Sequence, residues 1–368
     1  KEIGLAVAGL GKQLWALVTT PVGALLATLG ALFALFQSNK QTVIDFNSGL
    51  RNVSKTTGIA GDDLNDFGDA IIDLSMKLKV IDSTKLLEYA TVAGQLGVKG
   101  RADILAFTEA LAMLETASDI KGEEGATEIA RMLTLVDGGV QNVKAFGDEI
   151  VNLGNNFATT EKEILANAEQ IAQNVGIYKI GRQDVLAFAT ATKAVGLEAE
   201  LVGSTFSRTL GEFEKTIRSG KGVADLLKVI GGTSAELSKR FKDDAAGVFV
   251  DYVRGLNEIN KSGGSVNEAL ERTGIIAVRD QRVIASLATN GFDVLTDALE
   301  KVTTAQGAMP AEFENGAGKL EQQSKRMGIA WDNFVLSIEN GEGAIGRSVV
   351  AIMGFFADLL DQINKTFN

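Results

Sequence analysis

Apolar side chains recur along this chain at alternating intervals of three and four residues, which places them on one face of an α-helix. No stretch alternates polar and apolar residues beside a hairpin turn, and only residues 177–180 resemble a short extended piece. No heptad repeat lasts long enough for a coiled coil. The pattern predicts an all-α fold, an array of short antiparallel helices with glycine corners. The spacing is clearest in three sets: Leu64, Phe67, Ile71, Leu74 and Leu78; Ile104, Phe107, Leu111 and Leu114; and Val143, Phe146, Ile150, Leu153 and Phe157.

Several helix starts are marked by capping boxes, in which a Ser or Thr and a Glu three residues later satisfy free amides of the first turn. The pairs with this spacing are Thr160 with Glu163, Thr233 with Glu236, and Ser265 with Glu268. They predict three helix N-termini.

We expect glycine to end almost all of the helices, because the chain holds 41 glycines and only two prolines. A glycine in the left-handed conformation ends a helix, and an apolar residue after it folds back on the last turn. This pattern predicts tight corners at six pairs: Gly58-Ile59, Gly97-Val98, Gly176-Ile177, Gly196-Leu197, Gly274-Ile275 and Gly328-Ile329.

The N-terminal segment, residues 1–40, differs from the rest of the chain. Residues 13–39 carry no charge, and Leu14 to Phe36 is apolar apart from three threonines. A helix of that length spans about 34 Å, close to the hydrocarbon thickness of a bilayer. Two readings stay open: a hydrophobic helix buried in an oligomer or against the rest of the chain, and a helix that contacts a membrane at some stage. A cleaved signal peptide fits less well, because the apolar run is too long and no start Met precedes it. We expect an excerpt or a processed product, since the first residue is Lys1.

Beyond the hydrophobic segment, composition divides the chain into three further parts. Residues 41–302 form the predicted helical core module, and residues 303–318, rich in Gly, Ala, Thr and Glu and containing Pro310, form a predicted linker. Residues 319–368 form a predicted pair of amphipathic helices that need partners to bury their apolar faces. These faces consist of Met327, Trp331, Phe334 and Ile338 in one helix, and Val349, Ile352, Phe355, Phe356, Leu359 and Ile363 in the other.

The residue types for several kinds of chemistry are missing. The chain has no His and no Cys, which removes disulfides, thiol nucleophiles, the usual zinc ligands and imidazole acid/base chemistry. Its net charge of −11, without a segregated basic face, argues against specific nucleic-acid binding. No Asp or Glu stands out as a glycosidase carboxylate. We therefore predict no enzymatic activity, no cofactor, and no catalytic, cofactor-binding or metal-binding residues.

Three local motifs invite a ligand site and are better explained by helix ends. The acidic cluster Asp62, Asp63, Asp66 and Asp69 would put apolar Phe67 in a ligand position of a calcium loop, so we expect carboxylates in a first helical turn. Residues 220–222, Gly-Lys-Gly, lack the flanking residues of a phosphate-binding loop and predict a solvated turn. Residues 231–234, Gly-Gly-Thr-Ser, predict one helix end followed by one helix start.

Residues 86–259 resemble the core region shared by bacteriophage tail tape-measure proteins. The resemblance lies in the order and spacing of helices and glycines, without a catalytic signature, and with 319–360 included it covers most of residues 40–365. The stretches that carry it are YATVAGQLGVKGRADILAFTEALAML (89–114), NAEQIAQNVGIYKIGRQDVLAFATATKAVGLEAELVGSTFSRTL (167–210), VADLLKVIGG (223–232) and KLEQQSKRMGIAWDNFVLSIENGEGAIGRSVVAIMGFFADLL (319–360).

The resemblance implies a structural protein of the virion that occupies the lumen of the tail tube, helps to set tail length and leaves ahead of the genome. It implies tail tube protein, tail tip or baseplate hub proteins and tail-assembly chaperones as partners, with a homo-oligomer in the tube and possible host-membrane contact through Leu14 to Phe36. A straight helix of the whole chain would reach only about 550 Å, so we expect a compact module at one end of the tape.

Two other classes of protein remain as alternatives. A membrane-inserting helical pore former would use the segment Leu14 to Phe36, although such proteins usually need two spans and only one is convincing here. A structural coil that links bacterial partners would need long heptads, which are missing.

Overall fold

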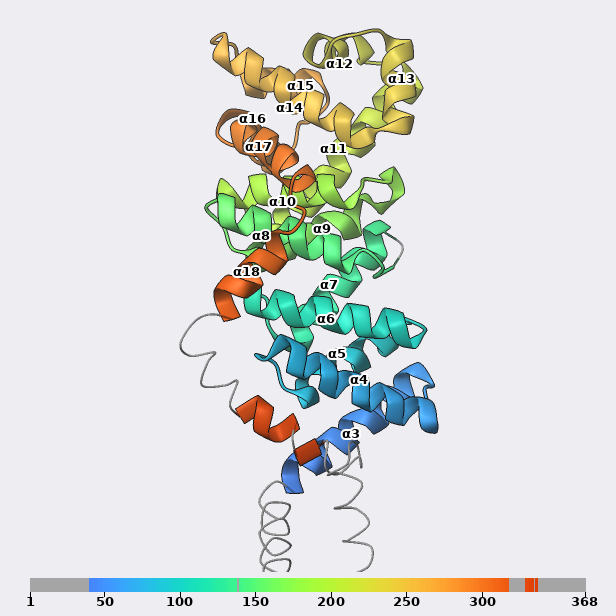
Figure 1. The fold of residues 1–368 in the computed structure, drawn as a ribbon. Helices are drawn as coiled ribbons and strands as arrows, with labels where there is room; N and C mark the ends of the chain where they lie inside the picture. The colour runs from blue at the N-terminus through green and yellow to red at the C-terminus, as the bar shows by residue number, and fades with distance from the viewer. Residues whose placement is uncertain (1–39, 138, 318–327, 334, 337–368) are drawn as a thin grey trace, which may run out of the picture. The chain divides into compact units, whose positions relative to one another are not determined.

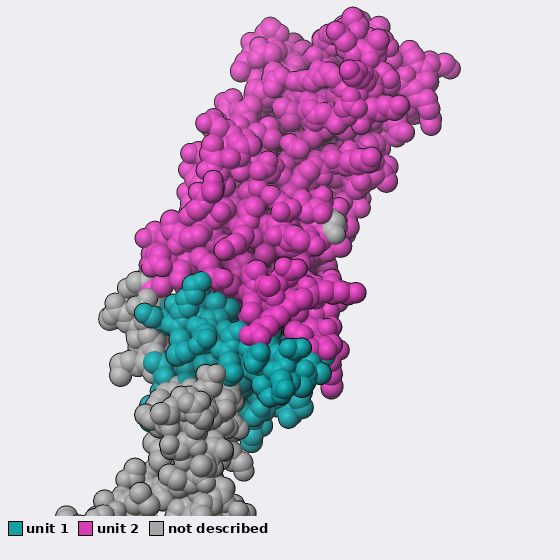
Figure 2. Space-filling model, turned by 45° about the vertical axis from the view of Figure 1, so that its right-hand side comes forward, with its two compact units in different colours: residues 1–54, 60–87, 325–368 teal, residues 55–59, 88–324 magenta. Residues whose placement is uncertain are grey.

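The computed structural model describes residues 40–137, 139–317, 328–333 and 335–336. Within these ranges the regular structure consists of α-helices and one short 3-10 helix, with no strand. The all-α prediction is therefore confirmed for the described part of the chain. Two compact units can be distinguished: unit 1 comprises residues 1–54, 60–87 and 325–368, and unit 2 comprises residues 55–59 and 88–324 (Figure 2).

The helices are short, and Figure 1 shows them in chain order. They are α3 (Lys40–Thr57), α4 (Asp62–Leu78), α5 (Ser83–Gln95), α6 (Arg101–Ala117), α7 (Gly122–Asp137), α8 (Val143–Asn156), α9 (Glu161–Val175), η1 (Gly176–Tyr178), α10 (Arg182–Ala194), α11 (Ala199–Ser219), α12 (Val223–Ile230), α13 (Ser234–Asp243), α14 (Ala245–Lys261), α15 (Val266–Arg272), α16 (Val278–Thr289), α17 (Phe292–Thr303) and α18 (Ala308–Ala317).

Unit 1 is held together by an apolar core and by a small buried network of polar side chains. Phe46 of α3, Phe67 of α4 and Leu86 of α5 are almost fully buried. The Ser83 hydroxyl donates to the Asn333 side-chain oxygen (2.6 Å), and the Asn333 amide donates to the Ser75 hydroxyl (3.0 Å). All three side chains are buried, so these bonds fix residues 328–333 on α4 and α5.

Unit 2 is organised around α10, in which every residue from Val185 to Thr192 is buried. A helix that is buried all round needs neighbours on every side, and α10 packs against α17, α9 and α8. Its two threonines satisfy their hydroxyls within the helix, Thr190 on the Leu186 carbonyl and Thr192 on the Phe188 carbonyl. Phe188 joins Phe206 of α11 and Phe249 of α14 in an aromatic cluster with ring centroids 4.5 to 5.4 Å apart.

Two helix crossings in unit 2 require glycine because backbone approaches backbone. A Cβ on Gly203 of α11 would overlap the Gln170 carbonyl of α9, and a Cβ on Gly255 of α14 would overlap the Val229 carbonyl of α12. Glycine therefore has a second role in this fold, at close helix contacts as well as at corners.

Most predicted helix ends are confirmed. Thr160 and Thr233 form complete capping boxes, and the Ser265 hydroxyl accepts from the Glu268 amide. Gly97, Gly196 and Gly274 have positive φ, and the apolar residue after each donates its amide back to the helix, in the six-residue closure of a Schellman motif. Gly58 also has positive φ.

Two predicted stops and the extended piece are wrong. Gly176 keeps right-handed helical angles, and the chain tightens into η1 before Lys179 takes the left-handed conformation with φ 53°. Residues 177 and 178 are thus 3-10 helical, and Ile177 is 78% exposed instead of folding back. Gly328 is helical and stands at the start of the described helical residues 328–333.

In place of the predicted linker at residues 303–318, the chain forms α18, which packs against α6 and α8. Pro310 fits because it stands in the first helical turn, where its missing amide costs no intrahelical hydrogen bond. The Asp148 carboxylate of α8 accepts from the amides of Gly307 and Met309, both at 3.0 Å. Met309 and Phe313 are buried, so this stretch is part of unit 2.

The apolar N-terminal segment, Leu14 to Phe36, and the predicted apolar helix from Val349 to Ile363 lie outside the described residues. Of the face predicted around Trp331, only Trp331 itself is described, and it is 42% exposed. Ile329, Val335 and Leu336 are buried instead. Among the described helices, none combines the length and the apolar character needed to cross a bilayer. The predicted boundaries at residues 40 and 319 stay predictions.

Candidate interaction surface

The three local motifs lie where helix-end chemistry puts them. Asp62 and Asp63 occupy the first turn of α4, with Phe67 buried beneath. Residues 220–222 turn between α11 and α12, and Gly231 ends α12 just before the Thr233 cap. Over the described ranges, no group of three or more Asp, Glu, His or Cys residues is placed to hold a metal ion.

A buried ionic cluster joins three helices of unit 2. The guanidinium of Arg182, at the start of α10, donates to both carboxylate oxygens of Glu149 on α8 (2.6 and 2.9 Å) and also pairs with Asp137 at the end of α7. Glu149 is 3% exposed. Burial alone would lower the pKa of Arg182, but the two carboxylates raise it on balance. The ion pairs of the cluster fix the junction of α7, α8 and α10.

A second buried carboxylate ties α16 to α11. Asp280 is 4% exposed and accepts from the Thr205 hydroxyl (2.7 Å) and from the Arg208 guanidinium (2.7 Å to Nε). Burial by itself would raise the pKa of Asp280, and the bonds from Arg208 and Thr205 bring it below its ordinary value. Sequence reasoning missed both Glu149 and Asp280, because their partners lie on other helices and no local motif marks either carboxylate.

A carboxyl pair stands at the start of α9. The Asp119 carboxylate, in the loop between α6 and α7, accepts from the Lys162 amide at 2.8 Å and so caps the start of α9. Burial raises the pKa of Glu161, and the neighbouring Asp119 raises it further. These groups satisfy helix-terminal amides, which assigns the pair a structural role.

An open groove of about 640 Å³ lies in unit 2 between η1, the end of α11 and α13. We call it the η1 groove. Its apolar lining consists of Ile177, Tyr178, Ile217 and Phe241. Tyr178 and Phe241 meet edge to face, with centroids 6.0 Å apart. The groove brings together side chains from three segments that are separated in the sequence.

The fold and surface are those of a helical protein that presents packing faces and an open groove. Comparison with protein families gives its class. Residues 68–309 match the family of phage-related minor tail proteins, and the chain belongs to that family. It is therefore a component of a phage tail. No curated protein and no solved structure matches it.

Proposed function

We propose that this chain is part of a tail tape-measure protein, a structural component that helps to set tail length, scaffolds tube assembly inside the lumen and is ejected ahead of the genome. The observation that carries the proposal is the family match over residues 68–309, because it runs from within α4 to the start of α18 and so includes the helices α6 to α17, which make up most of unit 2. Catalysis has no part in the proposal.

The proposed partners are the tail tube protein, the tail tip or baseplate hub proteins and the tail-assembly chaperones. A tape inside a tube meets the same subunit many times, and a helical array offers repeated faces for that contact. We further propose a homo-oligomer within the tube, and membrane contact through Leu14 to Phe36 on ejection.

An epitope inserted at the exposed corner of Gly231 and Gly232 tests the location. Phage that carry the insertion and keep wild-type tail length are labelled with gold-conjugated antibody before and after triggered DNA release. A lumenal protein stays unlabelled in intact tails and becomes accessible on release. Labelling along the outside of intact tails would contradict the proposal.

Tail length is tested separately by in-frame deletions, each measured on electron micrographs. If the chain is stretched in the tube, a deletion shortens the tail by up to about 1.5 Å per residue removed. A compact end module shortens it by much less or abolishes assembly. Full-length tails from a virus that lacks residues 88–317 would overturn the tape-measure role.

The membrane alternative rests on the apolar composition of Leu14 to Phe36. A pore-forming protein would release dye from liposomes as the isolated chain and lose this activity on changing Leu25 and Leu26 to Asp. Equal dye leakage by the original chain and the Asp variant would show that Leu14 to Phe36 is not the segment that forms the pore.

A further inference from the structure

We infer that the η1 groove is a docking site for an acidic amphipathic helix of another protein. Ile177, on the rim of the groove, is 78% exposed, and Tyr178, Ile217 and Phe241 are only partly covered. Apolar side chains grouped in a concavity differ from the single exposed apolar residues that every surface carries. The inference goes beyond the proposed function, since it does not depend on whether the chain sets tail length.

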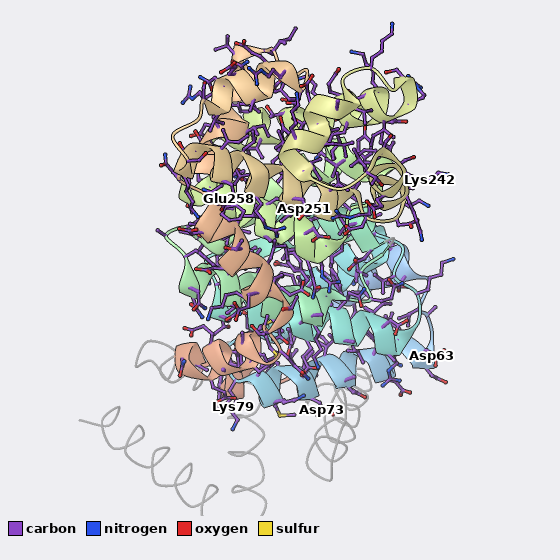
Figure 3. The ribbon with its side chains drawn as sticks, turned by 90° about the horizontal axis from the view of Figure 1, so that it is seen from above. Asp63, Asp73, Lys79, Lys242, Asp251 and Glu258 are labelled. Atoms are coloured by element: carbon purple, nitrogen blue, oxygen red, sulfur yellow. The ribbon has the colours of Figure 1, made fainter. Side chains whose placement is uncertain are left out.

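The charge of the groove selects the partner. Three cations line it, Lys179, Arg218 and Lys242, against one carboxylate, Glu214. The whole chain carries −11, so this local excess of positive charge departs from the average of the molecule. In Figure 3 Lys242 extends from the outer edge of the ribbon, in a position where it can meet an approaching chain. A partner with carboxylates beside its apolar stripe is complementary to this rim.

The conformation of Lys179 supports the inference. Its φ of 53° lies in the left-handed region, which strains a residue with a Cβ and which glycine adopts freely. Glycine occupies most of the other positive-φ corners of the described chain. A lysine here keeps a cation at the mouth of the groove at a position where glycine would relieve the strain.

The size of the groove points to a helix rather than to a nucleic acid. Its volume of about 640 Å³ suits the side chains of one or two helical turns, spaced at i, i+3, i+4 and i+7. The Glu214 carboxylate repels a phosphate backbone, and the exposed Ile177 side chain offers it no hydrogen bond or charge. Helix α11 packs against α13, and Tyr178 of η1 contacts Phe241 of α13, so the site is preformed in unit 2.

The test uses the full chain and a synthetic helical peptide of about 20 residues, with leucines on one face flanked by glutamates. A matched peptide replaces each glutamate by lysine, and a DNA duplex of similar length serves as the third probe. Binding is followed by fluorescence anisotropy at low and moderate salt. We expect saturable binding of the acidic peptide only, with affinity that falls as salt rises.

Two variants assign that binding to the groove. Ile177→Asn and Lys242→Glu each lower the affinity for the acidic peptide by about tenfold or more, and a tenfold loss corresponds to about 1.4 kcal/mol of binding free energy. Ile276→Asn and Lys144→Glu change equally exposed residues that do not line the groove, and they leave the affinity unchanged. Circular dichroism melts check that all four variants fold.

Several results would overturn the inference. They are no saturable binding of the acidic peptide, equal binding of the lysine peptide or the duplex, and unchanged affinity in both groove variants. Concentration-dependent self-association of the chain alone, lost in Ile177→Asn, would assign the groove to a second copy instead.

Discussion

Helix α10 and the hairpin of α12 and α13 belong to the same unit and contrast sharply in burial. Eight consecutive residues of α10 are buried, whereas α12 buries Val223 and Leu226 and α13 buries only Leu237. Figure 1 shows the hairpin at one end of unit 2, whereas α10 lies among other helices. Local stability follows the apolar surface removed from water, so we expect the hairpin to open far more readily than the centre.

The contrast also separates two kinds of helix. The capping box of Thr233 with Glu236 and the glycine corner at Gly231 and Gly232 give α13 a well-formed N-terminus without much packing. Helix α10 lacks a side-chain N-cap and depends on its neighbours. Local signals can therefore define a helix that contributes little to the core, and tertiary packing can stabilise one with weak ends.

The largest expected difference in unfolding free energy comes from removing one aromatic ring near α10 and one ring in the hairpin of α12 and α13. Phe206→Ala empties part of the buried aromatic cluster and is expected to cost about 3 to 5 kcal/mol. Phe241→Ala, in the partly exposed groove, is expected to cost about 1 kcal/mol, because the site is already open to water. Urea unfolding followed by circular dichroism measures both. Equal losses would show that the hairpin is as tightly packed as the centre.

The next largest difference is expected from substituting the glycines at the two close helix crossings. Gly203→Ala forces α9 and α11 apart and is expected to lower the free energy of unfolding by about 2 to 3 kcal/mol. Gly255→Ala produces a similar backbone overlap, but α12 can shift to accommodate it. Hydrogen exchange should then show faster exchange confined to α12 and α13, with the protection of α10 unchanged. Loss of protection throughout the unit in Gly255→Ala would contradict the comparison.

Acid titration distinguishes two aspartates with opposite pKa shifts. The pKa of Asp280 is lowered, so its contribution to stability is complete above the unfolded value near 4 and disappears as pH falls through the folded value. Asp280→Asn should cost about 1 to 2 kcal/mol at pH 7, and this cost should shrink as pH falls through the lowered folded value.

Burial raises the pKa of Asp184, and Asp244 raises it further, so ionised Asp184 destabilises the fold. This penalty is present at neutral pH and is relieved as pH falls through the raised value. Asp184→Asn should therefore stabilise the chain slightly at pH 7. Asp297→Asn, at an exposed site on α17, is the control for both variants.

The smallest expected effect on stability concerns Lys179, the residue that follows η1 and lines the η1 groove. Lys179→Gly relieves the left-handed strain, whereas Lys179→Ala removes the same charge and keeps the strain. The glycine variant should be more stable than the alanine variant by about 0.5 to 1 kcal/mol in thermal melts. The reverse order would mean that the corner is not strained.

The sequence carried enough information for the helices and for most of their ends. Apolar spacing identified Phe67, Phe107 and Phe146 as core residues, and all three are buried. Sequence reasoning failed where one local pattern can have two structural outcomes. Gly176-Ile177 has the same pattern as Gly97-Val98, yet the residue that takes the left-handed conformation is Lys179. An interior glycine such as Gly203 also looks like a corner glycine until its neighbouring helix is known.

The groove and the ionic clusters were beyond sequence reasoning for a different reason. Arg182 and Glu149 are 33 residues apart, and Tyr178 and Phe241 come from separate helices. Each pair is set by tertiary packing, which spacing along one helix does not record. Helix α18 shows the same limit, because the partner that caps it, Asp148, lies about 160 residues earlier.

The return of α18 to α6 and α8 has a consequence for biosynthesis. At translation rates of about 5 to 20 residues per second, roughly 8 to 30 seconds separate the emergence of α8 from that of α18. Throughout that interval the apolar surface that receives Met309 and Phe313 has no cover. A nascent chain in this state is exposed to aggregation, so any factor that binds it during translation acts before unit 2 can close.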